Sequence, residues 1–528
     1  MVTRRRMIGA ALATGGGVLL LRATVRPAPL QAAHTADAHG TGTGTGTGNG
    51  NGNGTGNGNG TDMDMGTDTA AGTGAAADPG PDAGPALAEK FTAALPVPPV
   101  LSPVDTADGT DTYSVTMLRS FARILPGHRT EVLTYNGAFP GPVIRARSGR
   151  PVVVRQRNLL DDPVSVHLHG AAVPAASDGG PMNLLDAGAA RTYTYPNDQP
   201  HANLWFHDHA HQLESEHVYR GLSGTYLLTD ATEAALPLPS GRYDLPIALR
   251  DARFDHAGRL VYRMDDPAGR ATILANGRPW PKVEVAARKY RLRLLNSSNL
   301  RFFSLRLADG GPITWIGSDG GLLEHPHTTD TVDLSPGERA DVVIDFSRYR
   351  VGSSVVFTNS MPPGPAEHVG VVLRFDITRA AHDPSSVPAR LRTLPALPTA
   401  VARERTVVLT VDERPGAAPR GMIDGKVYDP NRVDAAVAFG TSEIWTVVNG
   451  NKDTPHNFHL HLVQFRVLAR NGKAPGPEES GLKDTVRLMP GESVRLQASF
   501  TSYRGRYPYH CHLLDHSAMG MMAQMEIT

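Results

Sequence analysis

The one cysteine of the chain lies between two histidines, in the run His510-Cys511-His512, and His516 and Met521 follow within ten residues. A thiolate, two imidazoles and a weakly bound thioether are the ligands of blue-copper electron-transfer sites. A tetrahedral zinc site is the alternative for a Cys/His set. Zinc would leave the methionine and the histidines elsewhere in the chain without a role, so the run favours copper.

Histidines also gather in three other short windows, which are His167-x-His169, His207-x-His209 and His456-x-x-His459-x-His461. A single His-x-His pair is a weak signal, because two histidines on one face of a strand occur by chance. Four windows in one chain, one of them holding the only cysteine, indicate a centre with several metal ions.

Side-chain alternation along a strand sorts these ligands into two sites, because residues an even number apart share a face. Cys511 then points away from its two neighbours, and His456 points away from His459. We expect one site with Cys511 and His456, onto which the loop carrying His516 and Met521 folds back. The ligands of opposite parity form the second site: His459, His461, His510 and His512.

With the two early windows, the second site gathers eight imidazoles. Eight neutral nitrogen donors match three copper ions that share a pocket for O2. The ligands come from the two ends of the chain, so the first and last domains must pack together.

Short strands must hold these residues. The chain contains three copies of one pattern, a turn followed by an apolar strand. The turns Asn136-Gly137, Asn276-Gly277 and Asp424-Gly425 each lead into an apolar run that ends in an asparagine, at Asn158, Asn296 and Asn449. The runs are bounded by Gly, Pro and Asn, and long helical periodicity is absent. This pattern predicts an all-β chain of three consecutive Greek-key β-sandwich domains, over 106–235, 236–385 and 400–528. The middle copy has Leu305-Arg306-Leu307 where the others have paired histidines, so it is expected to hold no copper.

The first 105 residues are predicted to be an export signal followed by a flexible linker. Residues 1–38 place Arg4, Arg5 and Arg6 before a weakly apolar run, which predicts a twin-arginine export signal, with an uncleaved anchor as the alternative. Residues 39–105 are rich in Gly, Thr and Asn and are expected to be a disordered linker. We therefore expect an exported protein, extracellular, in the cell wall or periplasmic.

The amino-acid composition argues against some classes of binding partner. The 528 residues include 52 Lys and Arg and 52 Asp and Glu, so the chain lacks the excess of positive charge that is typical of nucleic-acid-binding proteins. A single cysteine excludes an intramolecular disulfide. We expect a monomer with no membrane partner beyond the export machinery.

The four windows and the three-domain layout resemble the multicopper oxidases, over about residues 110–528. The resemblance implies cupredoxin-like domains and four copper ions, with a small reducing substrate and O2 as the partners and water as the product. It assigns the type 1 copper to His456, Cys511, His516 and Met521. It assigns the type 2 copper to His167 and His459. It assigns the type 3 pair to the other six histidines: His169, His207, His209, His461, His510 and His512.

Two local stretches look like those of bacterial laccases, spore-coat oxidases and bilirubin oxidases. They are His167-Leu-His-Gly with Ser177-Asp178-Gly179, and Leu204-Trp-Phe-His-Asp-His209. Asp178 resembles the family's acid beside the type 2 copper, which implies a proton relay; a plain Asp-Gly turn is the alternative. Many bacterial relatives carry a second acid directly after the equivalent of His516, where this chain has Ser517.

The resemblance favours a laccase-like oxidase of phenols or similar organic donors, with Cys511 and Asp178 as the working residues. A metal-ion oxidase acting on Cu(I) or Mn(II) is the alternative, although residues 350–480 hold no methionine-rich insert. A non-enzymatic electron carrier or copper-binding protein is the alternative from another class. A carrier needs only the cysteine site, so the eight other clustered histidines argue against it.

Overall fold

The computed structural model of the chain describes residues 88–412, 414 and 418–528. The predicted export signal and residues 39–87 of the predicted linker lie outside the described residues. Within the described part, no helix is both long and apolar enough to cross a membrane.

The first domain consists of two four-stranded sheets, ordered β2-β1-β4-β6 and β3-β8-β7-β5, around one apolar core. Its strands are β1 (Asp111–Ala122), β2 (Thr130–Tyr135), β3 (Val143–Arg147), β4 (Val152–Asn158), β5 (Val166–His169), β6 (Ala190–Tyr195), β7 (Ala202–Asp208) and β8 (Ser223–Thr229). Its helices are short: the 3-10 turn η1 (Ala107–Gly109), α1 (Ala175–Asp178), α2 (Glu214–Arg220) and α3 (Ala231–Ala234).

The second domain pairs a seven-stranded sheet, β11-β10-β9-β13-β18-β15-β16, with a five-stranded sheet, β12-β20-β19-β14-β17. Its strands are β9 (Asp244–Ala252), β10 (Thr272–Ala275), β11 (Arg278–Pro279), β12 (Lys282–Ala287), β13 (Lys289–Asn296), β14 (Phe303–Leu307), β15 (Ile313–Ser318), β16 (Gly321–Thr329), β17 (Val332–Leu334), β18 (Arg339–Asp345), β19 (Ser354–Asn359) and β20 (Val371–Ala380). Its helical turns are η2 (Gly241–Tyr243), η3 (Phe346–Arg348) and α4 (Ala366–Val369).

The third domain pairs a six-stranded sheet, β22-β21-β24-β29-β26-β27, with a five-stranded sheet, β23-β31-β30-β25-β28. Its strands are β21 (Arg403–Asp412), β22 (Arg420–Ile423), β23 (Ala435–Val437), β24 (Thr441–Asn449), β25 (His456–Leu460), β26 (Phe465–Arg470), β27 (Leu482–Lys483), β28 (Thr485–Leu488), β29 (Ser493–Phe500), β30 (Gly505–His510) and β31 (Met522–Ile527). Its helical turns are η4 (Pro477–Glu479) and α5 (Leu514–Ala518). The predicted all-β fold of three cupredoxin-like domains is confirmed.

The asparagine that ends the apolar run makes the same hydrogen bonds in each domain. Asn158, Asn296 and Asn449 end strands β4, β13 and β24, and each carboxamide oxygen accepts a bond from the backbone N–H two residues later. Each carboxamide nitrogen donates to two backbone carbonyls, one of them in a distant segment. A buried amide so fully bonded holds the strand end and the following loop in one position.

The repeated turns also have a common cause. Asn136, Asn276 and Asp424 have φ values of 54°, 45° and 52°, in the left-handed region that asparagine and aspartate tolerate best after glycine. In each copy the side-chain oxygen accepts a backbone N–H of the neighbouring strand, from Thr116, Ala248 and Val408. The internal repeat in the sequence is therefore a repeat of turn chemistry as well as of hydrophobic runs.

The structure differs from the predicted linker at its C-terminal end. Residues 91–101 lie along the first two domains, where Leu95 N–H donates to Lys282 O and Leu101 N–H donates to Val143 O. Asn276 also donates to the Pro96 carbonyl. Composition alone missed this because an extended Pro-rich segment can still donate and accept backbone hydrogen bonds along a sheet edge.

One arginine ties the three domains together. Arg339, at the start of β18, donates through Nε to the Asn203 carbonyl of β7 at 2.8 Å. Its guanidinium also forms a two-pronged ion pair with Asp484, at 2.7 and 2.5 Å. Both side chains are fully buried, where a two-pronged pair is strongly directional. The middle domain thus holds the first and third domains in register.

Candidate copper centres

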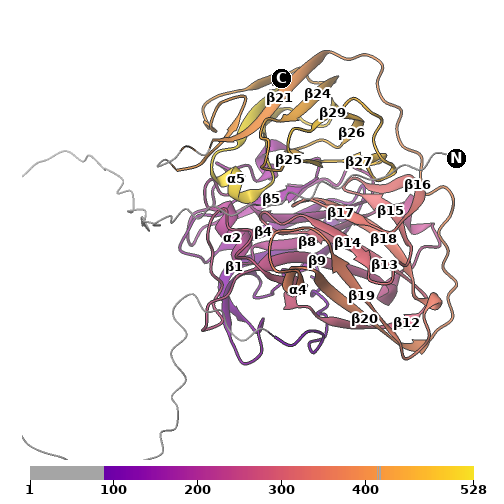
Figure 1. Cartoon of the computed structure of the whole chain (residues 1–528). Helices are drawn as coiled ribbons and strands as arrows, with labels where there is room; N and C mark the ends of the chain where they lie inside the picture. The colour runs from indigo at the N-terminus through magenta and orange to yellow at the C-terminus, as the bar shows by residue number, and fades with distance from the viewer. Residues whose placement is uncertain (1–87, 413, 415–417) are drawn as a thin grey trace, which may run out of the picture. The chain divides into compact units, whose positions relative to one another are not determined.

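Four strands bring the histidine windows together at the junction of the first and third domains. In the first domain β5 pairs with β7, which sets His167 opposite His207. In the third domain β25 pairs with β30, which sets His459 opposite His510. Figure 1 shows β5 and β25 next to each other where the purple and yellow parts of the chain meet. Strand register within each domain therefore decides which rings face the junction.

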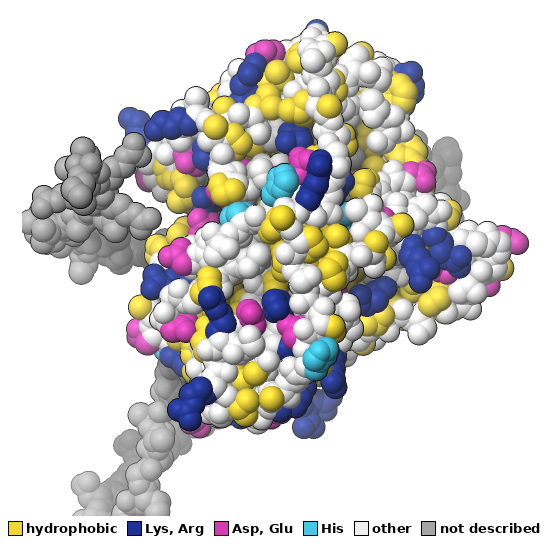
Figure 2. All heavy atoms as spheres, turned by 90° about the vertical axis from the view of Figure 1, so that its right-hand side faces the viewer, with side chains coloured by type: hydrophobic (Ala, Val, Ile, Leu, Met, Phe, Trp, Pro, Cys, Tyr) yellow, Lys and Arg dark blue, Asp and Glu magenta, His cyan; other side chains and the backbone are white. Residues whose placement is uncertain are grey.

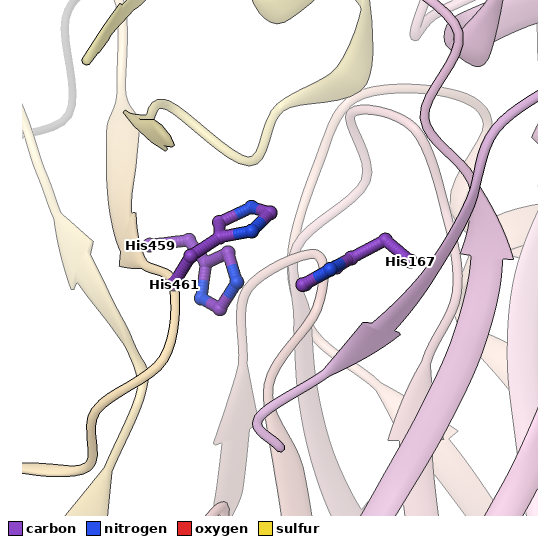
Figure 3. A group of neighbouring side chains, drawn as sticks. All are labelled: His167, His459 and His461. Atoms are coloured by element: carbon purple, nitrogen blue, oxygen red, sulfur yellow. The ribbon is translucent and has the colours of Figure 1, made fainter. Parts of the chain in front are cut away.

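The eight rings form one buried cluster, and each is at most 1% exposed. His167 stacks on His461 with ring centroids 3.8 Å apart, and His169 stacks on His459 at 3.7 Å, so both stacks cross the domain junction. In Figure 3, His167 reaches from one strand toward His459 and His461 on the other side. Three overlapping sets keep their ligand atoms within 4.8 Å: His167 with His459 and His461, His167 with His169 and His207, and His209 with His461 and His510.

Six of the eight rings have one nitrogen hydrogen-bonded to a protein oxygen, which leaves the other nitrogen available to the centre. The Nδ1–H groups of His167, His459, His207 and His510 donate to backbone carbonyls at 2.7 to 3.0 Å. Among the described residues, the Nε2 atoms of His167 and His459 find no hydrogen-bond partner, although both are buried. Buried ring nitrogens without a hydrogen-bond partner are available to bind a metal ion.

The protonation state also suits a metal. Burial, with the neighbouring rings adding to it, lowers the pKa of His167, His169, His459, His461 and His512 well below the usual value. Burial likewise lowers the pKa of His207 and His510 to about 3. Neutral imidazoles present free lone pairs, so the set fits copper ions without first losing protons.

A second, separate site surrounds the cysteine. The Nδ1 atoms of His456 and His516 lie 3.8 and 3.9 Å from Cys511 Sγ and 3.1 Å from each other. His456 is held from behind, since its Nε2–H donates to Asn451 Oδ1 at 2.9 Å. Burial raises the pKa of the Cys511 thiol to about 12, so a metal ion must displace its proton. Two imidazoles and one thiolate converging in this way match a trigonal copper site.

The segment after strand β30 was predicted to be a loop, but it contains a short helix. His516 lies in the helix α5, and Met521 directly precedes β31. Met521 is fully buried, its carbonyl accepts the Cys511 N–H at 3.1 Å, and its own N–H donates to the His516 carbonyl at 3.1 Å. These backbone bonds close the segment over the cysteine, as the expected fold-back requires. The helix was missed because it is only five residues long, too short for a periodic pattern.

Asp178 lies between the two domains' ligands. Its carbonyl accepts from His167 Nδ1 at 2.7 Å, and its carboxylate oxygen Oδ2 accepts from His461 Nδ1 at 2.9 Å. The other carboxylate oxygen, Oδ1, lies 3.6 Å from His167 Nδ1 and has no hydrogen-bond partner among the described residues. Burial raises the Asp178 pKa to about 8, so the carboxyl can carry a proton near neutral pH. A turn is also present, since Gly179 follows with φ of 70°, but the turn alone does not explain the contact with His461.

The sequence missed a second buried acid, Asp484. Its Oδ1 accepts from His169 Nε2 at 2.9 Å, which leaves His169 Nδ1 without a partner among the described residues. Asp484 is paired with Arg339, so its charge stays balanced. The sequence around it gives no distinguishing signal, because Asp484 lies in a stretch with other charged residues, Glu478, Glu479 and Arg487. Its histidine partner is 315 residues away, which no local pattern can show.

The remaining histidines have other surroundings. His217, on α2, donates to Asp208 at 2.9 Å, and His211 lies in the turn before that helix. His325 is exposed, whereas His327 and His368 are partly buried. On the face drawn in Figure 2, histidines show only as separate spots. The clustered histidines are interior, as the burial of the two sites requires.

Three β-sandwiches with a cysteine site in the last domain and a histidine cluster shared with the first define a class of copper oxidoreductases. Family models described as multicopper oxidase match residues 119–233, 257–369 and 398–528. The chain belongs to the multicopper oxidase family.

Similar proteins include several oxidases. A laccase of Bacillus subtilis is 36% identical over 512 aligned positions, covering 83% of this chain and 99% of the relative. A bilirubin oxidase of Albifimbria verrucaria is 35% identical over 474 positions, covering 83% and 81%. The crystal structure of a laccase from Pediococcus acidilactici matches with a TM-score of 0.78 at 34% identity, over 84% of this chain and 95% of that one.

One relative has a different kind of name. The cell division protein FtsP of Photorhabdus laumondii is 32% identical over 460 positions, covering 82% of this chain and 92% of the relative. Membership of the family therefore does not settle the activity, which must be argued from the site.

Proposed function

We propose that the protein is a laccase-like oxidase that couples four one-electron oxidations of an organic donor to the reduction of O2 to two waters. The observation that carries the proposal is the pair of sites. One is a cysteine site suited to single-electron transfer, and the other is a cluster of eight imidazoles suited to several ions. The oxidase relatives support the same reading.

Four copper ions fit the donors. His456, Cys511, His516 and Met521 would hold the type 1 ion. His167 and His459, whose Nε2 atoms lack partners among the described residues, would hold the type 2 ion. The other six histidines would hold the type 3 pair: His169, His207, His209, His461, His510 and His512. When bound, the ions supply one-electron steps at the cysteine site and four-electron chemistry at the cluster.

The chain itself links the two sites. Cys511 is joined by one peptide bond to His510 and by one to His512, and both of these rings face the cluster. No covalent path between a cysteine ligand and a histidine ligand can be shorter. The backbone thereby fixes the separation of the sites, and packing of the third domain keeps it constant.

His516 is the ligand nearest the outside of the cysteine site. It is 3% exposed, and its Nε2 lies 3.9 Å from Asp265 Oδ1 in the second domain. An organic donor that reaches this edge needs to lose a proton as well as an electron if it is a phenol. A carboxylate at the imidazole edge suits that demand, which favours phenolic donors.

Two alternative functions would require different features of the sites. A metal-ion oxidase would bind a cation at the same edge, where the Asp265 carboxylate would suit Mn(II), whereas Cu(I) prefers softer sulfur ligands. A non-enzymatic electron carrier or copper-binding protein would have no use for eight buried imidazoles. The cluster therefore favours an enzyme, and the donor separates the two enzyme readings.

Oxygen consumption by the copper-loaded protein tests the proposal. We expect a phenol to support the fastest uptake, with a bilirubin-type pigment, Cu(I) and Mn(II) slower, and four donor electrons used for each O2. Fastest uptake with Cu(I) or Mn(II) would favour the metal-ion oxidase. Copper binding with no uptake from any of the four donors would contradict an oxidase function.

Replacing Met521 tests the cysteine site separately. We expect Met521→Leu to stay folded and blue but to raise the type 1 reduction potential. A thioether donates weakly to copper and favours Cu(II) over a site with no axial donor. A redox titration followed at the blue band measures the shift, with Met519→Leu as the matched control. An unchanged potential would mean that Met521 is not the axial ligand.

We also propose export by the twin-arginine route to an extracellular, cell-wall or periplasmic location, on the strength of Arg4, Arg5 and Arg6 before an apolar run. This route carries folded proteins, which suits a copper enzyme loaded before or around export.

A further inference from the structure

A buried acid of the first domain contacts Ser517, the residue after His516. The Ser517 hydroxyl donates to Glu214 Oε1 at 3.0 Å, and both residues are fully buried. The second carboxylate oxygen, Oε2, has no hydrogen-bond partner within the described part of the chain. A buried carboxyl with one bonded and one open oxygen is uncommon unless it has a function or holds water.

This contact lies one helical turn from the cluster's ligands on both sides. Glu214 N–H donates to the Ala210 carbonyl, and Ala210 directly follows the ligand His209. Ser517 N–H donates to the Leu513 carbonyl, and Leu513 directly follows the ligand His512. The Glu214–Ser517 bond therefore joins the two segments that leave the cluster, one from each domain.

Further polar contacts between the three domains surround the Glu214–Ser517 hydrogen bond. Ser215, next to Glu214, donates to Asp515, and Asn299 of the second domain donates to the Ser215 hydroxyl at 2.7 Å. Arg270 balances the Asp515 charge at 2.8 Å. Helices α2 and α5 are thus fixed against each other (Figure 1), so the carboxyl and the hydroxyl keep their contact without a moving part.

The surroundings keep Glu214 able to hold a proton. Burial, with a smaller contribution from the Asp208 charge, raises its pKa to about 8 against the lowering effects of the Ser517 bond and of His217. Asp208 itself accepts hydrogen bonds from His217 and from the Ser165 N–H.

His211 and Tyr428 are further polar side chains at the segment that carries Glu214. Burial, then the charges of Asp429 and Asp434 and last that of Glu214, raise the pKa of Tyr428. The Tyr428 hydroxyl has no partner among the described residues. The His211 ring packs edge-on against Tyr428 at 4.9 Å and is partly exposed. Buried polar atoms without a protein partner are common positions for ordered water, and such water can carry protons.

We propose that Glu214 passes protons through the Ser517 hydroxyl to the copper cluster during O2 reduction. The inference rests on the proposed oxidase function. Reduction of O2 to two waters takes four electrons from the donor and four protons from solvent. The Ser517 hydroxyl turns and hands its own proton toward the cluster, takes a replacement from the protonated Glu214 carboxyl, and Glu214 regains a proton from the side of Tyr428. It is a relay residue acting through Ser517.

The test compares Glu214→Gln with Glu216→Gln, a partly exposed glutamate on the same helix. A glutamine keeps an acceptor for the Ser517 hydroxyl, so fold and copper content should be retained. We expect reoxidation of the fully reduced protein by O2 to slow about tenfold or more in Glu214→Gln, since Asp178 remains as a second route. The control should stay within about a factor of three of wild type.

A second variant moves the acid to the other side of the contact. Glu214→Gln combined with Ser517→Glu should recover most of the lost rate, because the carboxyl returns to the same place from α5. Infrared spectra of the copper-free proteins give a readout independent of turnover. The carboxylic acid band of wild type that titrates at about pH 8 should be weaker in Glu214→Gln and unchanged in Glu216→Gln.

The outcomes separate the two proposals. If copper-loaded wild type fails to reduce O2 with any donor, the oxidase function is wrong. If wild type reduces O2 but Glu214→Gln reoxidises as fast and with the same pH profile, Glu214 is only a contact between domains. A slow Glu214→Gln that the Ser517→Glu change does not restore, with an unaltered infrared band, would equally overturn the relay.

Discussion

Replacing the cysteine ligand is expected to abolish the blue colour and turnover together. In Cys511→Ser, the hydroxyl cannot supply the thiolate whose charge transfer to copper gives the intense visible band. Turnover with phenols should fall to background, because the donor's electrons enter at this site. The cluster's eight imidazoles are untouched, so about three of the four copper ions should remain per chain.

Optical absorption, copper counted per chain and O2 uptake measure these effects in one preparation. Asn457→Ala is a matched control, since Asn457 lies on β25 beside the sulfur but offers no ligand to copper in our assignment. The control should remain blue and active. A blue, active Cys511→Ser protein would overturn the assignment of both sites, since the chain has no other cysteine.

The fold was predictable because its signals are local. An Asn-Gly or Asp-Gly turn before each apolar run demands a left-handed backbone at residues such as Asn136 and Asn276, which is where the structure has it. Strand parity was equally local. It separated His456 from His459 within β25, and the structure directs the first to the cysteine site and the second to the cluster.

What the sequence could not show depends on contacts between domains. Asp484 reaches His169 across 315 residues, and Glu214 reaches Ser517 across 303. A lone acid in a strand or helix looks the same whether it faces solvent or another domain. The sequence shows that Ser517 stands where many bacterial relatives carry an acid. The acid that contacts Ser517, Glu214, can be identified only from the packing of the domains.

The last prediction concerns the acid on the opposite side of the cluster. We expect Asp178→Asn to keep its copper but to reoxidise about a hundredfold more slowly, within the range typical of a lost general acid. An asparagine oxygen can still accept from His461 Nδ1, so the ligand geometry is preserved. It cannot carry a proton to the reacting oxygen. Anaerobic reduction of the type 1 copper by donor should be near normal, because Cys511 and its partners do not contact Asp178.

The pH profile distinguishes a relay from a positioning role. Burial raises the Asp178 pKa to about 8, so wild type keeps its proton while the proton concentration in solvent falls. The ratio of wild-type to variant rates should therefore grow from acid pH up to about 8 and shrink above it, where Asp178 also loses its proton. Stopped-flow reoxidation measures both rates, with the exposed Asp186→Asn as control. A loss under about threefold, or one independent of pH, would reduce Asp178 to a residue that orients His461.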